Sequence, residues 1–161
     1  MRFAFLLVVL VFAGCPTELA EVCELSSELP VVDEGTGSAT RSDGGAFTNQ
    51  QANWSPGSNA SITIGLLSMI VAKDETGLGF DELVSSGALP ICVPQGEQSD
   101  TSGSSIFSEG GAFVTDAGHV GNVALLSLED DVLVGRFEVD VVSNDGESIK
   151  FTDGVFSATR L

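Results

Sequence analysis

The sequence predicts an all-β fold, an antiparallel β-sandwich with a small β-barrel as the alternative. Residues 44–161 contain about eight short apolar segments, which are separated by turns rich in glycine, asparagine and aspartate. Near the C-terminus, apolar and polar residues alternate with a period of two, and only one short segment of the domain has a helical pattern. Ten phenylalanines and no tyrosine indicate a core filled mainly by phenylalanine.

The first half of this domain contains the weaker strand candidates. Ala46–Trp54 is polar and predicts an edge strand. Ser61–Ala72 is the most apolar stretch outside the first twelve residues, and its apolar residues have both parities. This pattern predicts a central strand that is bent or bulged at Gly65. A buried helix over Leu66–Lys73 is the competing interpretation.

The middle of the domain contains the single helical signal. Phe80–Ser86 has its acidic residues early and is followed by Gly87, a common helix stop, so we expect two helical turns there. Leu89–Val93 predicts a short strand. Because Pro90 has no N–H to donate, this strand belongs at a sheet edge.

The last third gives the clearest strand signals. Ser105–Phe107 and Ala112–Thr115 predict short strands, and Asn122–Arg160 predicts an antiparallel meander of three or four strands. Asp153–Gly154 predicts either a second tight turn or a bulge in it. The residues expected to face the core are Leu133, Phe137, Val139, Val141, Ile149, Phe151, Phe156 and Ala158.

The N-terminus has the pattern of a secretory signal. Arg2 precedes ten apolar residues, Phe3–Phe12, and the small pair Ala13–Gly14 follows them. Ten residues are too few to cross a bilayer as a helix, which needs roughly 20. The pattern therefore predicts a signal peptide over residues 1–14.

Cys15 follows the small pair directly, and Ala13–Gly14–Cys15 resembles the bacterial lipobox, in which Leu is commonest where Phe12 stands. This resemblance implies that Cys15 becomes the first residue of the mature chain and carries acyl chains. Each buried methylene of such a chain contributes about 0.8 kcal/mol, so several chains hold a protein at a membrane. An ordinary cleaved signal peptide is the alternative.

Residues 15–43 are expected to form the lipidated cysteine and an acidic flexible tether, with the folded domain over residues 44–161. Proline and glycine disfavour regular secondary structure in this stretch, and its carboxylates give it a high negative charge. If Cys15 is acylated, Cys23 and Cys92 remain as a pair of thiols in an oxidising compartment. We expect a Cys23–Cys92 disulfide that fastens the tether to the domain.

The composition is strongly acidic, with 23 acidic residues, 6 basic residues and a formal charge of −17. The basic residues are scattered, so no patch is available to neutralise phosphates, and nucleic acid is not an expected partner. The charge also repels anionic lipid surfaces. Divalent cations or a basic partner are the natural counter-charges.

The sequence offers no convincing catalytic group. His119 is the only histidine, and no Gly-X-Ser-X-Gly segment precedes a helix. We therefore expect no catalytic residues, no enzyme activity and no cofactor. No metal site is expected either. The speculative exception is calcium held by Glu129, Asp130 and Asp131 with Asp153, because calcium prefers carboxylate and carbonyl oxygens.

The segment from Gly135–Val139 through Gly154–Ala158 resembles the closing hairpin of many uncharacterised bacterial β-rich lipoproteins. This resemblance implies a location and a fold rather than a chemistry. The expected function is that of a lipid-anchored, membrane-attached cell-envelope protein facing the periplasm or the exterior, whose non-catalytic domain is structural or binds an unknown protein or small ligand. A small-ligand or calcium-binding β-barrel module is the alternative, and an envelope hydrolase ranks below both.

Overall fold

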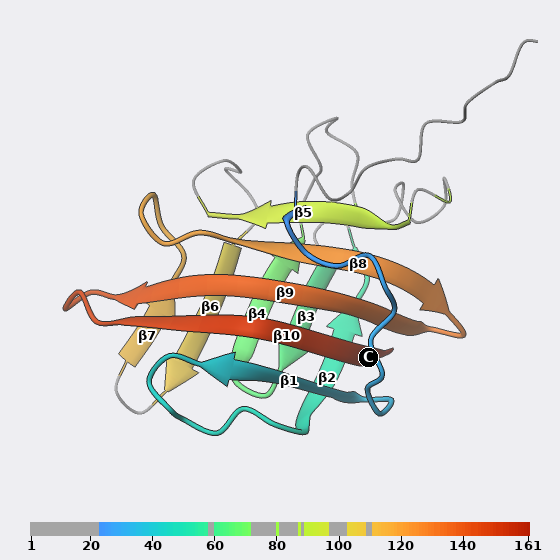
Figure 1. The fold of residues 1–161 in the computed structure, drawn as a ribbon, viewed down its shortest axis with the longest axis horizontal. Helices are drawn as coiled ribbons and strands as arrows, with labels where there is room; N and C mark the ends of the chain where they lie inside the picture. Colours follow the sequence, from blue (N-terminus) through green and yellow to red (C-terminus); the bar gives the residue numbers. More distant parts are fainter. Residues whose placement is uncertain are drawn as a thin grey trace, which may run out of the picture.

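The computed structural model describes residues 23–57, 60–71, 80, 87, 89–96, 103–108 and 111–161. These residues form an all-β fold in which ten strands belong to one hydrogen-bonded sheet (Figure 1). The strands are Thr36–Arg41 (β1), Gln50–Ser55 (β2), Ala60–Ile64 (β3), Leu67–Val71 (β4), Ile91–Gln95 (β5), Gly103–Ser108 (β6), Gly111–Val114 (β7), Gly121–Glu129 (β8), Val132–Ser143 (β9) and Ser148–Arg160 (β10).

The sheet folds over itself into two layers whose strands run across one another (Figure 1). One layer has the order β5-β8-β9-β10-β1, and the other has the order β7-β6-β4-β3-β2. Three short pairings connect the layers at opposite corners, β7 with β9 at one corner and β2 with both β10 and β1 at the other. The β2–β10 pairing is parallel, unlike the antiparallel pairing expected throughout. The result is a two-layer structure made from one continuous sheet, and it is not a regular barrel.

The C-terminal meander is confirmed and consists of three strands, β8, β9 and β10. Every second residue of β9 is buried from Leu133 to Val141, as its alternation predicts. At Asp153–Gly154 the chain makes a bulge rather than a turn, because the register of β10 against β9 shifts between Phe151 and Gly154. Asp153 adopts a φ of 54° there, which lets β10 continue to Arg160 as one strand.

The apolar stretch that was expected to be one central strand is a tight hairpin. Gly65 and Leu66 form the turn between β3 and β4, with Ile64 paired to Leu67. Gly65 has a φ of 56°, which glycine adopts readily. Since the turn reverses the chain, Ile62 and Ile64 before it and Leu67 and Met69 after it all reach the core, although they differ in parity.

The core lies between the two layers and is rich in phenylalanine. Its largest fully buried side chains include Phe80, Phe137, Phe151 and Phe156. Phe80 is helical and packs against Trp54 with ring centroids 5.5 Å apart, whereas the rest of the predicted helix over Phe80–Ser86 lies outside the described residues. Among the described residues, no helix has the length and apolar character needed to span a membrane.

The folded part of the chain begins well before residue 44. Thr36–Arg41 was expected to belong to the tether, but these residues form β1, which pairs with β10 and β2. Because β1 is polar, its sequence does not show the apolar pattern that would predict a strand. Its Gly37 is buried, and a Cβ there would lie 2.7 Å from Ile64 Cγ2, so the absence of a side chain is what lets β1 pack.

The chain before β1 also packs on the sheet. Figure 1 shows it passing from β5 over β8 and down to β1. Cys23 is buried against Ala124 and Leu126 on the outer face of β8, and Arg136 Nε donates a hydrogen bond to Glu28 O at 3.1 Å. The residues from Cys23 to Glu28 therefore contact the domain at two separate places.

Candidate functional site

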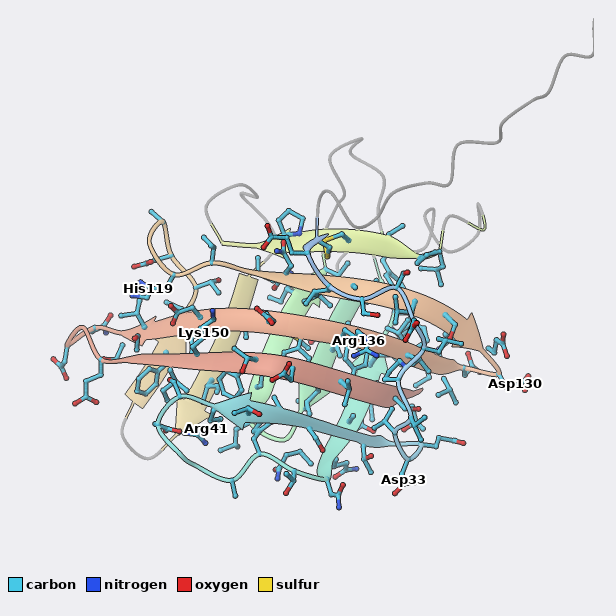
Figure 2. The ribbon with its side chains drawn as sticks, in the orientation of Figure 1. Asp33, Arg41, His119, Asp130, Arg136 and Lys150 are labelled. Atoms are coloured by element: carbon cyan, nitrogen blue, oxygen red, sulfur yellow. A yellow bond between two sulfur atoms is a disulfide. The ribbon has the colours of Figure 1, made fainter. Side chains whose placement is uncertain are left out.

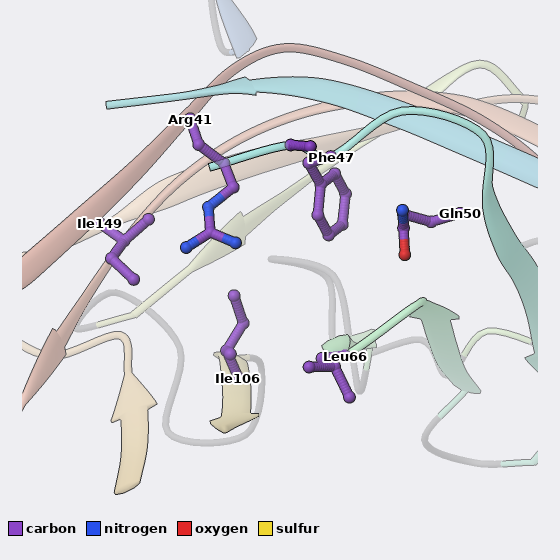
Figure 3. Close-up of a pocket in the computed structure, with 7 residues that line it drawn as sticks. Arg41, Phe47, Gln50, Leu66, Ile106 and Ile149 are labelled. Atoms are coloured by element: carbon purple, nitrogen blue, oxygen red, sulfur yellow. The ribbon is translucent and has the colours of Figure 1, made fainter. Parts of the chain in front are cut away.

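A pocket of about 130 Å³ opens at the β1 edge of the molecule, between the two layers. Figure 3 shows side chains from both layers converging on it. The lining residues come from β1, the loop after it, β2, the β3–β4 turn, β6 and β10; they are Arg41, Ala46, Phe47, Gln50, Leu66, Ile106 and Ile149.

Arg41 supplies the only charge in this lining. Its guanidinium points into the pocket (Figure 3) and lies 5.7 Å from the centroid of the Phe151 ring. Arg41 Nε donates to Asp43 Oδ1 at 3.0 Å, and a second guanidinium nitrogen contacts Asp43 Oδ2. The hydrogen bond from Arg41, followed by one from the Gly45 N–H, holds the pKa of Asp43 below its ordinary value of 3.8.

The walls of the pocket are apolar. Phe47 is 5 % exposed and packs edge-on against Phe151 with centroids 5.0 Å apart. A hydrogen bond from Ala39 N to Phe47 O, 2.8 Å long, attaches this part of the loop to β1. Ile106 and Ile149 are also buried, whereas Leu66 is 63 % exposed at the rim. The mouth therefore offers an apolar surface to solvent.

These residue types supply packing, a positive charge and hydrogen-bond donors. A guanidinium has five N–H donors, and Asp43 accepts only some of them. The volume is below the roughly 300–1,000 Å³ of pockets for drug-sized ligands. It is close to the roughly 150 Å³ of an apolar cavity that holds benzene. The site thus has the size of one ring or one short aliphatic chain.

Sequence reasoning did not identify this pocket. Its lining is spread along the chain from residue 41 to residue 149 and meets only when the sheet folds over. The single local sign is Arg41, one of six cations in an acidic chain, two residues before a carboxylate. Lys150 lies beside Arg41 along the β1–β10 pairing, in which Arg41 pairs with Phe151, whereas Figure 2 shows Arg136 farther along the layer.

The structure does not bring the four speculative calcium ligands together. Asp130 and Asp131 form the β8–β9 turn directly after Glu129, with φ angles of 50° and 64°. Asp153 lies elsewhere along the layer, because Gly154 pairs with Phe137 whereas Val132, next to the turn, pairs with Thr159. At about 3.3 Å per residue, five strand positions correspond to roughly 17 Å. The expectation failed because the bulge keeps Asp153 within β10 instead of placing it in a turn.

Asp131 instead contacts residues of β2 and β10. Its carboxylate forms an ion pair with Arg160 at 2.9 Å, and its backbone carbonyl accepts a hydrogen bond from Trp54 Nε1 at 2.9 Å. These contacts fasten the β8–β9 turn to the corner where β2 meets β10. Within the described part of the chain, no group of three or more His, Cys, Asp or Glu residues is arranged to hold a metal ion.

His119 lies in the loop between β7 and β8, at one end of the molecule (Figure 2). His119 Nδ1 lies 2.8 Å from Asp116 Oδ1, which also accepts hydrogen bonds from the backbone N–H groups of Gly118 and His119. The hydrogen bond from His119, followed by that from Gly118, lowers the pKa of Asp116. This local network orders the loop, and it lies apart from the pocket lining.

Cys23 and Cys92 form a disulfide, as expected, with their Cα atoms 5.6 Å apart. The bond joins the segment before β1 to β5, at the opposite edge of its layer from β1. Cys15, predicted to carry the lipid, lies outside the described residues. No family model, curated protein or solved structure matches this chain.

Proposed function

We propose that the chain is a lipid-anchored, non-catalytic binding protein of a bacterial cell envelope. The carrying observation is the N-terminal pattern, in which an apolar run ends in Ala13–Gly14 and Cys15 follows. The Cys23–Cys92 disulfide supports the proposal independently, because stable disulfides belong mainly to oxidising compartments outside the cytosol. The pairing of Cys23 with Cys92 is also compatible with acylation of Cys15, the third cysteine of the sequence.

Mass spectrometry of the protein purified from bacterial membranes tests this proposal. We expect an N-terminal Cys15 peptide that carries thioether-linked and amide-linked acyl chains, and a protein that stays in the membrane fraction at high salt. Cys15→Ala should abolish acylation and leave residues 1–14 attached, while Cys23 and Cys92 remain paired. An unmodified protein in the soluble fraction would contradict the anchor.

The pocket beside Arg41 favours a small ligand as what the domain binds. Its apolar walls suit one ring or one short aliphatic chain, and the N–H donors of Arg41 suit a single acceptor oxygen on that group. A carboxylate would have to compete with Asp43 for the guanidinium. A neutral alcohol, phenol or carbonyl compound therefore fits the site better than an acid.

Methyl-detected NMR with benzyl alcohol as the probe tests this binding. We expect saturable shifts at Ile106 and Ile149, which line the pocket, and none at Ile70, which is 40 % exposed on β4. Ala46→Leu is the matched variant, because Ala46 is exposed and lines the pocket, so a larger side chain blocks the site without disturbing the core. Equal shifts in the variant and the parent would exclude this site.

A further inference from the structure

We propose that the Cys23–Cys92 disulfide sets how the domain sits on the membrane. It holds the β5 edge beside the lipid surface and presents the Arg41 pocket on the side away from it. The inference rests on the proposed acylation of Cys15, and it adds a partner surface and an orientation to that function.

The folded domain does not start at residue 44, because it already includes Cys23. Cys23 is 2 % exposed, and its sulfur is bonded to Cys92. Asn122 Nδ2 donates a hydrogen bond to Cys23 O at 3.4 Å, and Leu126 packs beside the cysteine. A covalent bond, a hydrogen bond and buried apolar contacts therefore fix this residue to β5 and β8.

The chain after Cys23 is also attached to the sheet. The hydrogen bond from Arg136 to Glu28 O fixes it again on β9, and Gly35 N donates to Ser157 O at 2.7 Å as β1 begins. Because these contacts follow the disulfide in sequence, the anchor pulls first on the Cys23–Cys92 bond. The bond therefore carries the load that would otherwise peel residues 24–35 from the sheet.

The chain between the proposed anchor and the disulfide is short. Cys23 follows Cys15 by eight residues, so even a fully extended chain spans at most about 28 Å between them. Without the disulfide, a chain free as far as Gly35, where pairing with β10 begins, would span up to about 70 Å. The disulfide thus shortens the attachment by more than half and keeps the domain close to the lipid.

The pocket lies at the opposite edge of the layer from this attachment. The disulfide is on β5 and Arg41 ends β1, which are the two edges of the layer β5-β8-β9-β10-β1. Four strand spacings of about 4.8 Å separate these edges by about 19 Å. Figure 1 shows β5 and β1 on opposite sides of the molecule. A body held by a short chain at one edge keeps that edge nearest the surface, and the charge of −17 opposes laying the far side on anionic lipid.

Energy transfer to a lipid-bound acceptor tests the orientation in the acylated protein reconstituted into phosphatidylcholine vesicles. One probe is placed by Ala117→Cys, in the loop that leads into β8, where Gly121 pairs with Gln95 of β5. The other is placed by Thr40→Cys, an exposed position on β1. Each cysteine is labelled with a maleimide dye without reductant, so the native disulfide stays intact. We expect stronger transfer from residue 117 than from residue 40.

Two variants test whether the Cys23–Cys92 disulfide, here called the clamp, sets the orientation of the domain. Inserting twenty Gly and Ser residues directly before Cys23 adds a span of about 25 Å, so transfer should fall several-fold at both probes and their difference should disappear. The double variant Cys23→Ser/Cys92→Ser should move toward the insertion variant, with near-ultraviolet circular dichroism confirming that it is folded.

Equal transfer from the two probes in the parent, or transfer unchanged by the insertion, would overturn the clamp. Mass spectrometry of the same preparation separates this result from failure of the proposed function. An acylated chain without the predicted orientation refutes only the clamp, whereas an unacylated chain that does not float with vesicles refutes the anchor and the clamp together.

Discussion

At the scale of single residues, neighbouring strands of one layer leave no room for a side chain at some positions. Gly135, in the middle of β9, is buried between Ala124 O and the Phe156 ring, and an added Cβ would lie 2.4 Å from each. Gly154 is similar, with Phe137 O 2.5 Å from the position of a Cβ. These glycines are needed for close approach and not for an unusual φ, since neither has a positive value.

Gly135→Ala is therefore expected to destabilise the protein by about 1–3 kcal/mol or more, because backbone oxygen and a buried ring cannot both move aside. Urea unfolding followed by Trp54 fluorescence measures the loss. Gly118→Ala is the matched control, since a Cβ there meets only Asp116 Oδ1 at 3.7 Å, and we expect a change within about 0.5 kcal/mol. Equal stability of the two variants would show that β9 shifts to admit the methyl group.

The Asp43–Arg41 pair at the pocket makes a pH-dependent contribution to stability. Since folding lowers the pKa of Asp43, its stabilisation is fully present above the ordinary value of 3.8 and is lost as the pH falls through the folded value. Asp43 is 38 % exposed, so screening limits the contribution to about 0.2–1 kcal/mol. Asp43→Asn should therefore destabilise the protein at pH 7 and have little effect at a pH well below 3.8.

Urea titrations of Asp43→Asn and the parent at both pH values measure this difference, with Glu147→Gln, an exposed carboxylate in the β9–β10 turn, as the control. A loss that persists at low pH would mean that Asp43 acts through its shape rather than its charge. Asp43 does not line the pocket and benzyl alcohol is uncharged, so its binding should be kept in the Asn variant.

At the scale of elements, the segment before β1 depends on one covalent bond. The Cys23–Cys92 disulfide spans 69 residues of sequence, and closing a loop of that length stabilises a fold by up to about 4 kcal/mol on the chain-entropy account. We expect Cys23→Ser/Cys92→Ser to lose about 2–4 kcal/mol in urea unfolding. The parent should lose a similar amount when dithiothreitol is added, and the double variant should not respond to it. A parent that is fully reduced yet equally stable would contradict this role.

The elements that could be predicted from sequence are those that carry their own pattern. β9 alternates strictly, and β10 has a clear apolar face on each side of its bulge, so the residues predicted to face the core in both strands were correct. β1 was missed because Thr36–Arg41 has too little apolar surface to stand out, and its place depends on pairing with β10, more than a hundred residues away. The β3–β4 hairpin was read as one strand, because a two-residue turn at Gly65 interrupts the apolar run only briefly.

The candidate site was less predictable than the fold for a similar reason. The disulfide was predicted because counting cysteines needs no geometry. The pocket depends on how the two layers close at one edge, and nothing local to Phe47 or Ile106 indicates that they meet. The Asp153 error is of the same kind, because one residue of bulge decides whether a carboxylate lies in a turn or within a strand.

At the scale of the whole molecule, acidic side chains far outnumber the basic ones that could pair with them. The chain has 23 acidic against 6 basic residues, and the ion pairs of the described residues are few and exposed: Arg41–Asp43, Arg160–Asp131 and His119–Asp116. Carboxylates without partners repel one another over a Debye length of about 30 Å at 0.01 M salt, which is comparable to the molecule itself. The folded state therefore contains repulsion that salt can screen.

Raising sodium chloride from about 0.01 M to about 0.3 M at pH 7 should accordingly stabilise the protein by on the order of 1 kcal/mol, or a few degrees in Tm. The effect should nearly vanish at pH 4.1, where the net charge is close to zero. Because the described residues hold no cluster suited to a metal, we expect 1 mM calcium chloride to shift Tm no more than 1 mM magnesium chloride. A calcium shift several degrees beyond the magnesium shift would instead require a chelating site, since screening alone cannot distinguish two divalent ions of equal charge.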